Sequence, residues 1–455
     1  MTVKARRTPP SVKAASPLQV MNKAEMERMG ISEVADAVRH FSGVSVKDYG
    51  GIGGLKTISV RSLGAQHTGV IYDGVSVSDC QSGQIDISRF SLTNISQLTL
   101  TIGQSDDIYQ SARAFASAGV LHIQTDRPDF SEQNWHINTT LKAGSFGLAN
   151  PSVLYSQQLS QRTSFSLYGD YLRADGNYPF KLWNGNQLID SKRNNSDIQT
   201  YRAEATLYTS FTPKQDLQVK AYLFDSERGL PGGVIYDNPY AAERLSDKNY
   251  FGQFRYENRF SEKFKLQALG KFNYSWNRDY NDEASGITDD RYRQTESYLS
   301  ATLWTEPLKG LSFSLAQDFA YNYLHTTLDK CQFPERFTYL TAFAARYEHN
   351  RFSVTASLLN TYITEKYASV SLQTTGNGFH QPSVCPGNLF WKPVCVSAHR
   401  IRTFSALRLS MTSISGNRQH QSAPGNHTPG KPGSYLEPFK SGLSRLHQSF
   451  GRYLL

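Results

Sequence analysis

The sequence predicts a compact α+β unit followed by an antiparallel transmembrane β-barrel that is incomplete in this chain, with an irregular C-terminal tail. Three observations predict this fold class. Tyr, Phe and Trp number 26, 25 and 5 in 455 residues, whereas hydrophobic residues make up only 39%, a mixture that suits strands with one apolar and one wet face. No apolar run approaches the ~18 residues that a spanning helix needs. Period-two segments recur between residues 134 and 366.

Residues 1–21 are predicted to form an extended, mobile arm. They are polar and basic and contain Pro9, Pro10 and Pro17. The beginning of the sequence lacks the apolar segment of a signal peptide. Either the protein is cytoplasmic, or its true start lies upstream.

Residues 22–127 make up the predicted α+β unit. Apolar residues at helical spacing indicate two short helices, broken near Gly30. At about 100 residues, the unit is large enough for a small core of its own. A four-stranded sheet with glycine-assisted turns is expected to follow, with strands at 57–61, 68–72, 95–102 and 120–125.

Residues 134–366 supply about 10 to 12 predicted strands, roughly half of a large plugged barrel. Most runs have about 9 to 13 residues, the length of a tilted strand that crosses a bilayer. A soluble β-sandwich is the alternative, but its strands are usually about 5 or 6 residues long and its inner face is rich in Val, Ile and Leu. Aromatic residues near the strand ends favour the membrane barrel. In 265–277, the set predicted to face outwards is Leu266, Ala268, Gly270, Phe272, Tyr274 and Trp276.

Six short segments of the α+β unit follow one another in a recognisable order. They are 41–46 (FSGVSV), 58–61 (ISVR), 70–75 (VIYDGV), 84–86 (QID), 94–100 (NISQLTL) and 118–123 (AGVLHI). Taken together, they resemble the plug domain of TonB-dependent outer-membrane receptors, in particular receptors of the Bacteroides type. Ser42 and Ser62 depart from the family pattern, which usually has Pro and Gly at these positions. The resemblance implies plug-motif roles for Arg61, Asp73, Gly74, Gln84, Asp86 and Gly119.

The resemblance also implies a function. The protein would take up a scarce, bulky ligand, such as cobalamin or a siderophore, across the outer membrane of a Gram-negative cell. It would need no cofactor. Its partners would be outer-membrane lipid, a small chelate or corrinoid ligand, a surface lipoprotein and a periplasmic TonB-type energy transducer. The transducer would pair by β-augmentation with an energy-coupling arm at Thr2, Val3, Lys4 and Ala5.

Ligand contacts are expected from turns of the plug and from long external loops. Aromatic and polar side chains on such loops can grip a large chelate or corrinoid. For the plug positions, plain solvated turn residues are the alternative interpretation. The candidates are Gln66, His67, Gln81 and Ser82 in the plug, and Tyr178, Trp183, Tyr236 and Tyr240 in the loops.

We find no catalytic or metal-binding constellation in the sequence. His67 and Asp73 lie near serines but without a nucleophile elbow. The four cysteines lack metal-ligand spacing. The sequence therefore predicts that the protein is not an enzyme and has no metal site. A soluble or surface-attached β-rich binding or adhesion module remains the alternative function.

Residues 367–455 read as a tail without strands. Residues 371–455 contain nine Lys/Arg and one acid, so they carry +8 of the net +9, and the basicity gives no ground for a nucleic-acid partner of the body. Disorder or RNA binding are alternative interpretations, but the scattered Cys, Trp, His and Leu fit neither. Our hypothesis is a reading-frame shift near codons 367–375. The product would be truncated and would not transport as written.

Overall fold

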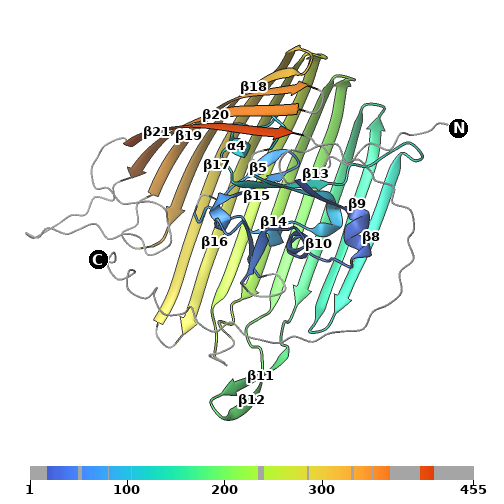
Figure 1. Cartoon of the computed structure of the whole chain (residues 1–455). Coiled ribbons are helices and arrows are strands. Elements are labelled where there is room, and N and C mark those ends of the chain that lie inside the picture. The colour runs from blue at the N-terminus through green and yellow to red at the C-terminus, as the bar shows by residue number, and fades with distance from the viewer. Residues whose placement is uncertain are drawn as a thin grey trace, which may run out of the picture. The chain divides into compact units, whose positions relative to one another are not determined.

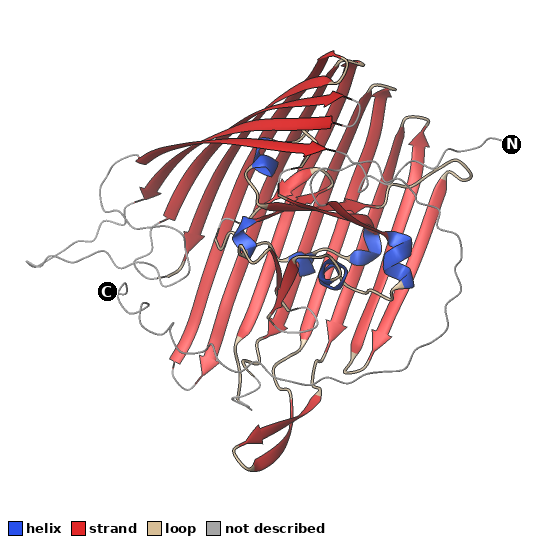
Figure 2. Ribbon diagram, in the orientation of Figure 1, coloured by secondary structure: helices blue, strands red, loops and turns tan. Residues whose placement is uncertain are grey.

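The computed structural model describes residues 18–49, 54–79, 81–103, 105–233, 240–283, 286–328, 333–349, 352–368 and 400–413. All of these residues belong to one compact unit that spans residues 1–414. Strands make up most of the structure, as Figure 2 shows. Among the residues described, no helix is both long enough and apolar enough to cross a membrane.

Two short helices lie near the start of the predicted α+β unit, which we call the plug, as predicted. They are α2 (Lys23–Arg28) and α3 (Val34–Arg39), and Gly30 between them has a positive φ of 66°. The Asn22 side chain caps α2 by accepting a hydrogen bond from the Glu25 N–H at 2.9 Å, which satisfies one of the free donors of the first turn.

The plug sheet has five strands, not the four expected. Its order is β1-β6-β7-β4-β5. The predicted strand at 57–61 lies outside this sheet, because within the described residues β3 (Lys56–Val60) forms a separate pair with β2 (Val44–Asp48). The extra strand β1 comes from the end of the predicted arm, and its Leu18 pairs with Thr101 of β6. The five strands are β1 (Leu18–Asn22), β4 (Thr68–Tyr72), β5 (Val75–Val77), β6 (Ile95–Ile102) and β7 (Gly119–Thr125).

A twelve-stranded antiparallel sheet, which we call the wall, follows the plug. Its strands have 10 to 23 residues; β8, β9 and β10 have the predicted length, and the others are longer. Figure 1 shows the blue elements of the plug against one face of the wall. The strands are β8 (Trp135–Gly144), β9 (Leu148–Ser160), β10 (Thr163–Ala174), β13 (Ile198–Thr212), β14 (Gln215–Gly229), β15 (Arg244–Ser261), β16 (Phe264–Glu283), β17 (Gly286–Leu308), β18 (Leu311–Thr326), β19 (Phe333–His349), β20 (Phe352–Ala368) and β21 (Arg400–Ser413).

The structure differs from the predicted tail at β21. Residues 400–413 form this strand and pair with β20, whereas we expected no strand after residue 366. Ile401, Leu407, Leu409 and Met411 fall at every second position, a partial alternation that the composition of the tail masks. Within the described residues, β8 and β21 are the two edges of the wall and do not pair with each other.

The wall alternates as the period-two pattern predicts. In β16, Phe272 is 57% exposed on the outer face, whereas Lys271 and Asn273 are each 4% exposed on the plug side. Leu269, the apolar exception on the polar face, is 2% exposed and packs on Val75 of the plug. The outer face is therefore apolar and the inner face polar, as in a membrane barrel.

The two ends of the wall differ in their connections. Two-residue turns at 161–162, 213–214, 262–263 and 309–310 define what we call the short-turn end. Residues 175–197 and 230–243 connect strands at the opposite, long-loop end. The first of these connections contains a separate hairpin of β11 (Pro179–Asn184) and β12 (Gln187–Lys192), which projects beyond the wall strands (Figure 1).

The plug sheet contains a histidine whose titration should affect stability. Burial lowers the pKa of the His122 imidazole to about 4 from its ordinary 6.5. Between these pH values the unfolded chain binds a proton that the folded plug does not, so stability falls as the pH falls. We expect His122→Gln to lose less thermal stability than the wild type when the full chain in detergent is taken from about pH 7 to pH 4.

The control for this measurement is His40→Gln. His40 is an exposed residue after α3. This variant should follow the wild type at every pH. Parallel pH profiles for wild type and His122→Gln would show that His122 does not contribute.

Candidate functional site

The plug meets the wall through buried polar side chains in three groups. Where a wall strand contacts the plug, every second residue faces it, so charged residues at these positions must be paired to be buried without a large cost. The three groups involve Lys220, Arg89 and Arg113, each paired with carboxylates.

The first group, the lysine cluster, is centred on the turn after β4. Lys220 of the wall lies 2.7 Å from Asp73 Oδ2 and 2.8 Å from Glu204 Oε2. Asp73 also accepts hydrogen bonds from the N–H and hydroxyl of Thr125, each at 2.8 Å. Asn94 donates to Glu204 at 3.1 Å. One buried ammonium thus joins a plug carboxylate to a wall carboxylate.

Tyr72 belongs to the same cluster. Its hydroxyl donates to both oxygens of Glu204 at 2.7 Å, and the Lys220 ammonium lies 4.4 Å from the centre of its ring. Burial, and then the charge of Glu204, raise the pKa of the Tyr72 hydroxyl well above its ordinary value, so the hydroxyl stays a donor. Gln253 of the wall donates to the Tyr72 carbonyl at 3.0 Å. The cluster therefore fixes both the backbone and the side chain of this turn.

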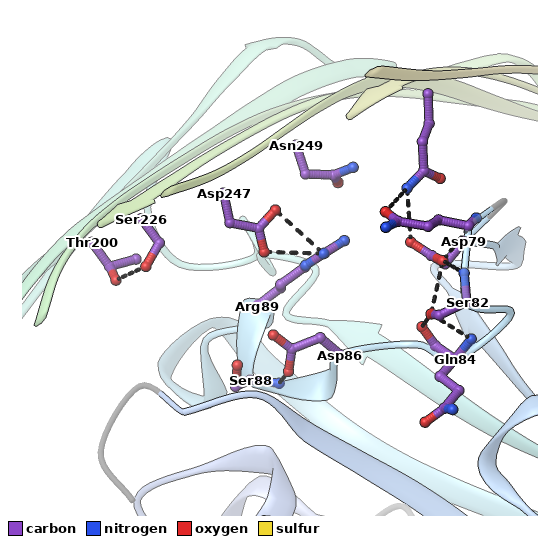
Figure 3. A network of polar contacts seen from close by, with 12 residues as sticks. Asp79, Ser82, Gln84, Asp86, Ser88, Arg89, Thr200, Ser226, Asp247 and Asn249 are labelled. Carbon is purple, nitrogen blue, oxygen red and sulfur yellow. Dashed lines mark hydrogen bonds and ion pairs between the residues drawn. The ribbon is translucent and has the colours of Figure 1, made fainter. Parts of the chain in front are cut away.

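The second group, the arginine cluster, lies towards the long-loop end. Arg89 of the plug pairs with Asp247 at 3.1 Å (Figure 3), and the fourth residue of β15 is Asp247. Burial alone would lower the pKa of Arg89, but nearby carboxylates, Asp247 first, raise it above its ordinary value. The Arg89 carbonyl accepts hydrogen bonds from Arg202 at 3.0 Å and from the Tyr222 hydroxyl at 2.6 Å.

The third group holds a short helix of the plug, α4 (Ala112–Phe115). Arg113 pairs with Glu296 at 2.9 Å, and its guanidinium lies 4.2 Å from the centre of the Tyr298 ring. Asp318 accepts from the Ala112 N–H at 3.1 Å and the Arg113 N–H at 2.8 Å. Glu296 is 0% and Asp318 1% exposed, so both carboxylates are buried against the plug.

A turn of the plug at residues 79–84 also contacts the wall and contains Gln81 and Ser82, two of the predicted ligand contacts. Asp79 accepts from the Ser82 N–H and hydroxyl, which shapes the turn (Figure 3). Gln294 of the wall donates to Gln81 at 3.1 Å. A cavity of about 130 Å³ beside the turn is lined by Gln66, Asp79 and Gly83, among others.

The structure brings together three of the four plug candidates for ligand contact. Gln66, Gln81 and Ser82 lie on or beside the 79–84 turn. Ser82 is exposed and Gln81 half-buried. The fourth candidate, His67, is exposed at the end of a short 3-10 helix (Ala65–His67) and does not line that cavity.

Three of the four loop candidates lie within the described residues. Trp183 is 69% exposed on the β11–β12 hairpin, and Tyr240 is 84% exposed. Tyr178 packs edge-on against Phe146, with ring centres 6.2 Å apart. Tyr236 lies outside the described residues, as do the arm residues Thr2, Val3, Lys4 and Ala5. The loop candidates and the arm therefore stay predictions.

The plug-motif residues occupy positions with a local structural reason. Arg61 has a positive φ of 50°, and its N–H donates to the Gly43 carbonyl at 2.8 Å. Asp86 is 2% exposed and accepts from the N–H groups of Lys56 at 3.0 Å and Ser88 at 2.9 Å. Gln84 closes the 79–84 turn by donating its N–H to the Ser82 hydroxyl at 3.2 Å.

Two glycines of the motif permit close packing. A Cβ on Gly74, whose φ is 89°, would lie 3.0 Å from the Arg255 side chain of the wall. A Cβ on Gly119 would lie 3.2 Å from both methyl groups of Val60. A side chain at position 74 would also be strained by the positive φ, and a side chain at position 119 would crowd Val60 in the core of the plug.

Sequence reasoning missed the residues that join plug and wall. These residues lie at alternate positions on the polar faces of the wall strands, and this alternation was the signal available in the sequence. They are Lys220, Glu204, Asp247, Glu296 and Asp318. Alternation alone does not distinguish a side chain that faces water from one that faces the plug. Among the described residues there is no group of three or more His, Cys, Asp or Glu placed to hold a metal ion.

Comparisons with known proteins agree with this architecture. Residues 10–117 match the family model for the TonB-dependent Receptor Plug Domain. The copper transporter OprC has a similar structure, with 15% identity and a TM-score of 0.65 over 86% of this chain and 59% of that chain. The FrpB iron transporter from Neisseria meningitidis (F3-3 variant) gives 10% identity and 0.65 over 88% and 62%.

A further similar structure is the ferric yersiniabactin uptake receptor FyuA from Yersinia pestis. It has 12% identity and a TM-score of 0.56 over 87% of this chain and 61% of that chain. At such identities the likeness concerns the fold. The chain spans 59% to 62% of the length of these three structures.

Proposed function

Through its plug domain this chain belongs to the TonB-dependent receptors, and we propose that it is an outer-membrane receptor for uptake of a metal chelate or a corrinoid. The observation that carries the proposal is a plug domain held against the polar face of a β-wall by buried ion pairs. In a closed barrel, such contacts would keep the plug in the lumen until work is done on it. The role is transport, not catalysis.

The ligand class follows from what the similar structures transport and from the aromatic loops of this chain. One is a copper transporter, one an iron transporter and one a ferric yersiniabactin receptor. We extend the class to this chain as a metal chelate such as a siderophore, and keep cobalamin as a candidate. Short turns on the periplasmic side and long loops outside are typical of outer-membrane barrels. The long-loop end would therefore receive the ligand.

A soluble binding or adhesion module is less well supported. Its exposed face would be polar, whereas the wall exposes Leu141 at 72%, Phe272 at 57% and Leu299 at 55%. These apolar residues lie on the face away from the plug, where lipid would cover them.

The periplasmic energy transducer, which would pair with Thr2, Val3, Lys4 and Ala5, belongs to the proposal as well. So does a surface lipoprotein partner.

Binding can be tested on the purified full chain in detergent. The probes are ferric citrate, a ferric catecholate siderophore, cobalamin and copper citrate, each titrated while tryptophan fluorescence is followed. We expect one class to bind, and Trp183→Ala to weaken that binding about tenfold or more, because exposed aromatic anchors dominate such contacts. No quenching by any of the four probes would contradict the proposed ligand class.

The matched control is Trp135→Ala. Trp135 is 53% exposed, much like Trp183 at 69%, but it lies on β8 of the wall. This variant should bind as the wild type does. Uptake of the ligand that binds is then compared in cells with and without the energy transducer, and equal uptake would contradict the proposed energy coupling.

A further inference from the structure

One segment of the plug leaves its sheet and packs on the wall. We call residues 105–117, which include α4, the flap. β6 ends at Ile102 and β7 begins at Gly119, and these two residues pair with each other. The N–H of Gly103 donates to the Ala118 carbonyl at 2.9 Å, and Gly103 has a positive φ of 81°. The flap is therefore a compact excursion through a narrow neck, as in an Ω-loop.

Apolar contacts of the flap are mainly with the wall. Ile108, Ala112 and Phe115 form one buried cluster with wall residues, three of them alanines. On the plug side, Ala114 packs against Ile71 and Val120. The wall residues of the cluster are Ala316, Leu340, Ala342 and Ala344.

Polar contacts fasten the flap to the same strands. Asp318 accepts two N–H groups of α4 and the Tyr298 hydroxyl, the last at 2.8 Å. Glu296 pairs with Arg113. Thr302 donates to the Gln110 carbonyl at 3.2 Å, and Arg346 donates to the Asp106 carbonyl at 3.2 Å. These contacts are separate from the lysine cluster, which holds the turn after β4.

Cavities lie on both sides of the flap. The cavity of about 130 Å³ beside the 79–84 turn is also lined by Arg113, Ala114 and Ser117. A second cavity of about 390 Å³ is lined by Asp107, Ile108 and Tyr109 together with Gly310, which belongs to a turn of the short-turn end. The flap thus stands between a space beside the candidate ligand turn and a space at the opposite end of the wall.

The inner face of the wall near the flap carries two small buried hydroxyl side chains, Ser300 and Ser314, which are 5% and 2% exposed. Ser300 is paired in register with Asp318, so a reporter group at this position lies beside the contacts of the flap.

We propose that the flap is the moving part that opens a passage for the ligand along β17, β18 and β19, while the rest of the plug sheet stays attached through the lysine cluster. This proposal rests on the proposed uptake function. Displacing the flap would break the contacts to Asp318 and Glu296 and join the two cavities. The small side chains of the wall, Ala316, Ala342 and Ala344, leave room there for a ligand to pass.

Hydrogen exchange on the full chain in detergent tests whether the flap moves alone. Asp318→Asn should speed the exchange of amides in 105–117 about tenfold or more, with amides of β4, β6 and β7 unchanged. The matched control is Asp247→Asn, which disturbs the Arg89 contact but should leave the flap unchanged. If Asp318→Asn does not fold, Tyr298→Phe takes its place. This milder variant removes one hydrogen-bond donor to Asp318 and should also speed amide exchange in the flap.

Either of two results would overturn the proposal at this stage. Exchange in β6 and β7 could rise together with that of the flap, which would mean that the plug moves as one body. Alternatively, amide exchange in the flap could be unchanged in both Asp318→Asn and Tyr298→Phe. Neither result bears on ligand binding or on transducer-dependent uptake, so the proposed function would stand or fall separately.

The passage itself is tested by labelling. Ser300→Cys, in a chain whose four native cysteines are replaced by serine, places a thiol near the flap. A small water-soluble maleimide should label this thiol slowly, and at least about tenfold faster when Asp318→Asn is added. If Asp318→Asn speeds amide exchange in the flap but leaves the labelling rate unchanged, flap motion opens no passage.

Discussion

Replacing Lys220 by methionine is expected to destabilise the docked plug by about 3 to 5 kcal/mol, the usual cost of removing one partner from a buried ion pair. Lys220 is 1% exposed and lies within 2.8 Å of both Asp73 and Glu204. Without the ammonium, two carboxylates would face each other in a buried interface. The measurement is the urea dependence of protease cleavage in the plug of the full chain in detergent.

The control is Lys248→Met. Lys248 also pairs with an aspartate, Asp225 at 3.0 Å, but both side chains are about 40% exposed. An exposed pair contributes about 0 to 1 kcal/mol, so this variant should differ little from the wild type. Equal cleavage midpoints for Lys220→Met and the wild type would mean that the lysine cluster does not hold the plug.

A charge on the outer face of the wall should be costly only if lipid covers it. Phe272→Arg places a guanidinium on β16, eight residues after Phe264 at the short-turn end. Near the middle of a bilayer such a change costs about 2 to 4 kcal/mol, and close to an interface about 0 to 1 kcal/mol. We expect the first cost for Phe272→Arg, measured by urea unfolding of the full chain in lipid bilayers.

Ile287→Arg provides the comparison. Ile287 is 70% exposed and is the second residue of β17, at the long-loop end. At this end the strand is expected to lie near or beyond the membrane interface, so the variant should be close to the wild type. If both variants are equally stable in bilayers, lipid does not cover the outer face at Phe272, and the soluble interpretation would regain support.

The fold was largely predictable because apolar and polar residues alternate along the strands of the wall. Phe272 and Lys271 illustrate this, since neighbouring residues face opposite sides and the chemistry of each face is visible in the sequence. The extra strand β1 was not predicted. The segment Leu18–Asn22 has only five residues and follows a Pro-containing segment. It forms a strand because it pairs with β6 at the edge of the sheet. Strand β21 was hidden by the composition around it.

The candidate site was predictable only in part, because pairing between plug and wall is a long-range property. Gln66, Gln81 and Ser82 could be placed in turns from local sequence, and the structure brings them to one place. Nothing local connects Asp73 with Lys220, or Arg113 with Glu296, which are 147 and 183 residues apart. Such contacts become visible only after the wall is folded around the plug.

The pairing of β1 with β6 determines how mechanical force would enter the plug. Leu18 pairs with Thr101, directly before the neck of the flap at Ile102 and Gly103. A pull on the chain ahead of Leu18 would load this edge ladder first and reach the core of the sheet only after the edge gives way. Tension is thus delivered next to the neck, at a point where a short edge strand can be peeled away residue by residue.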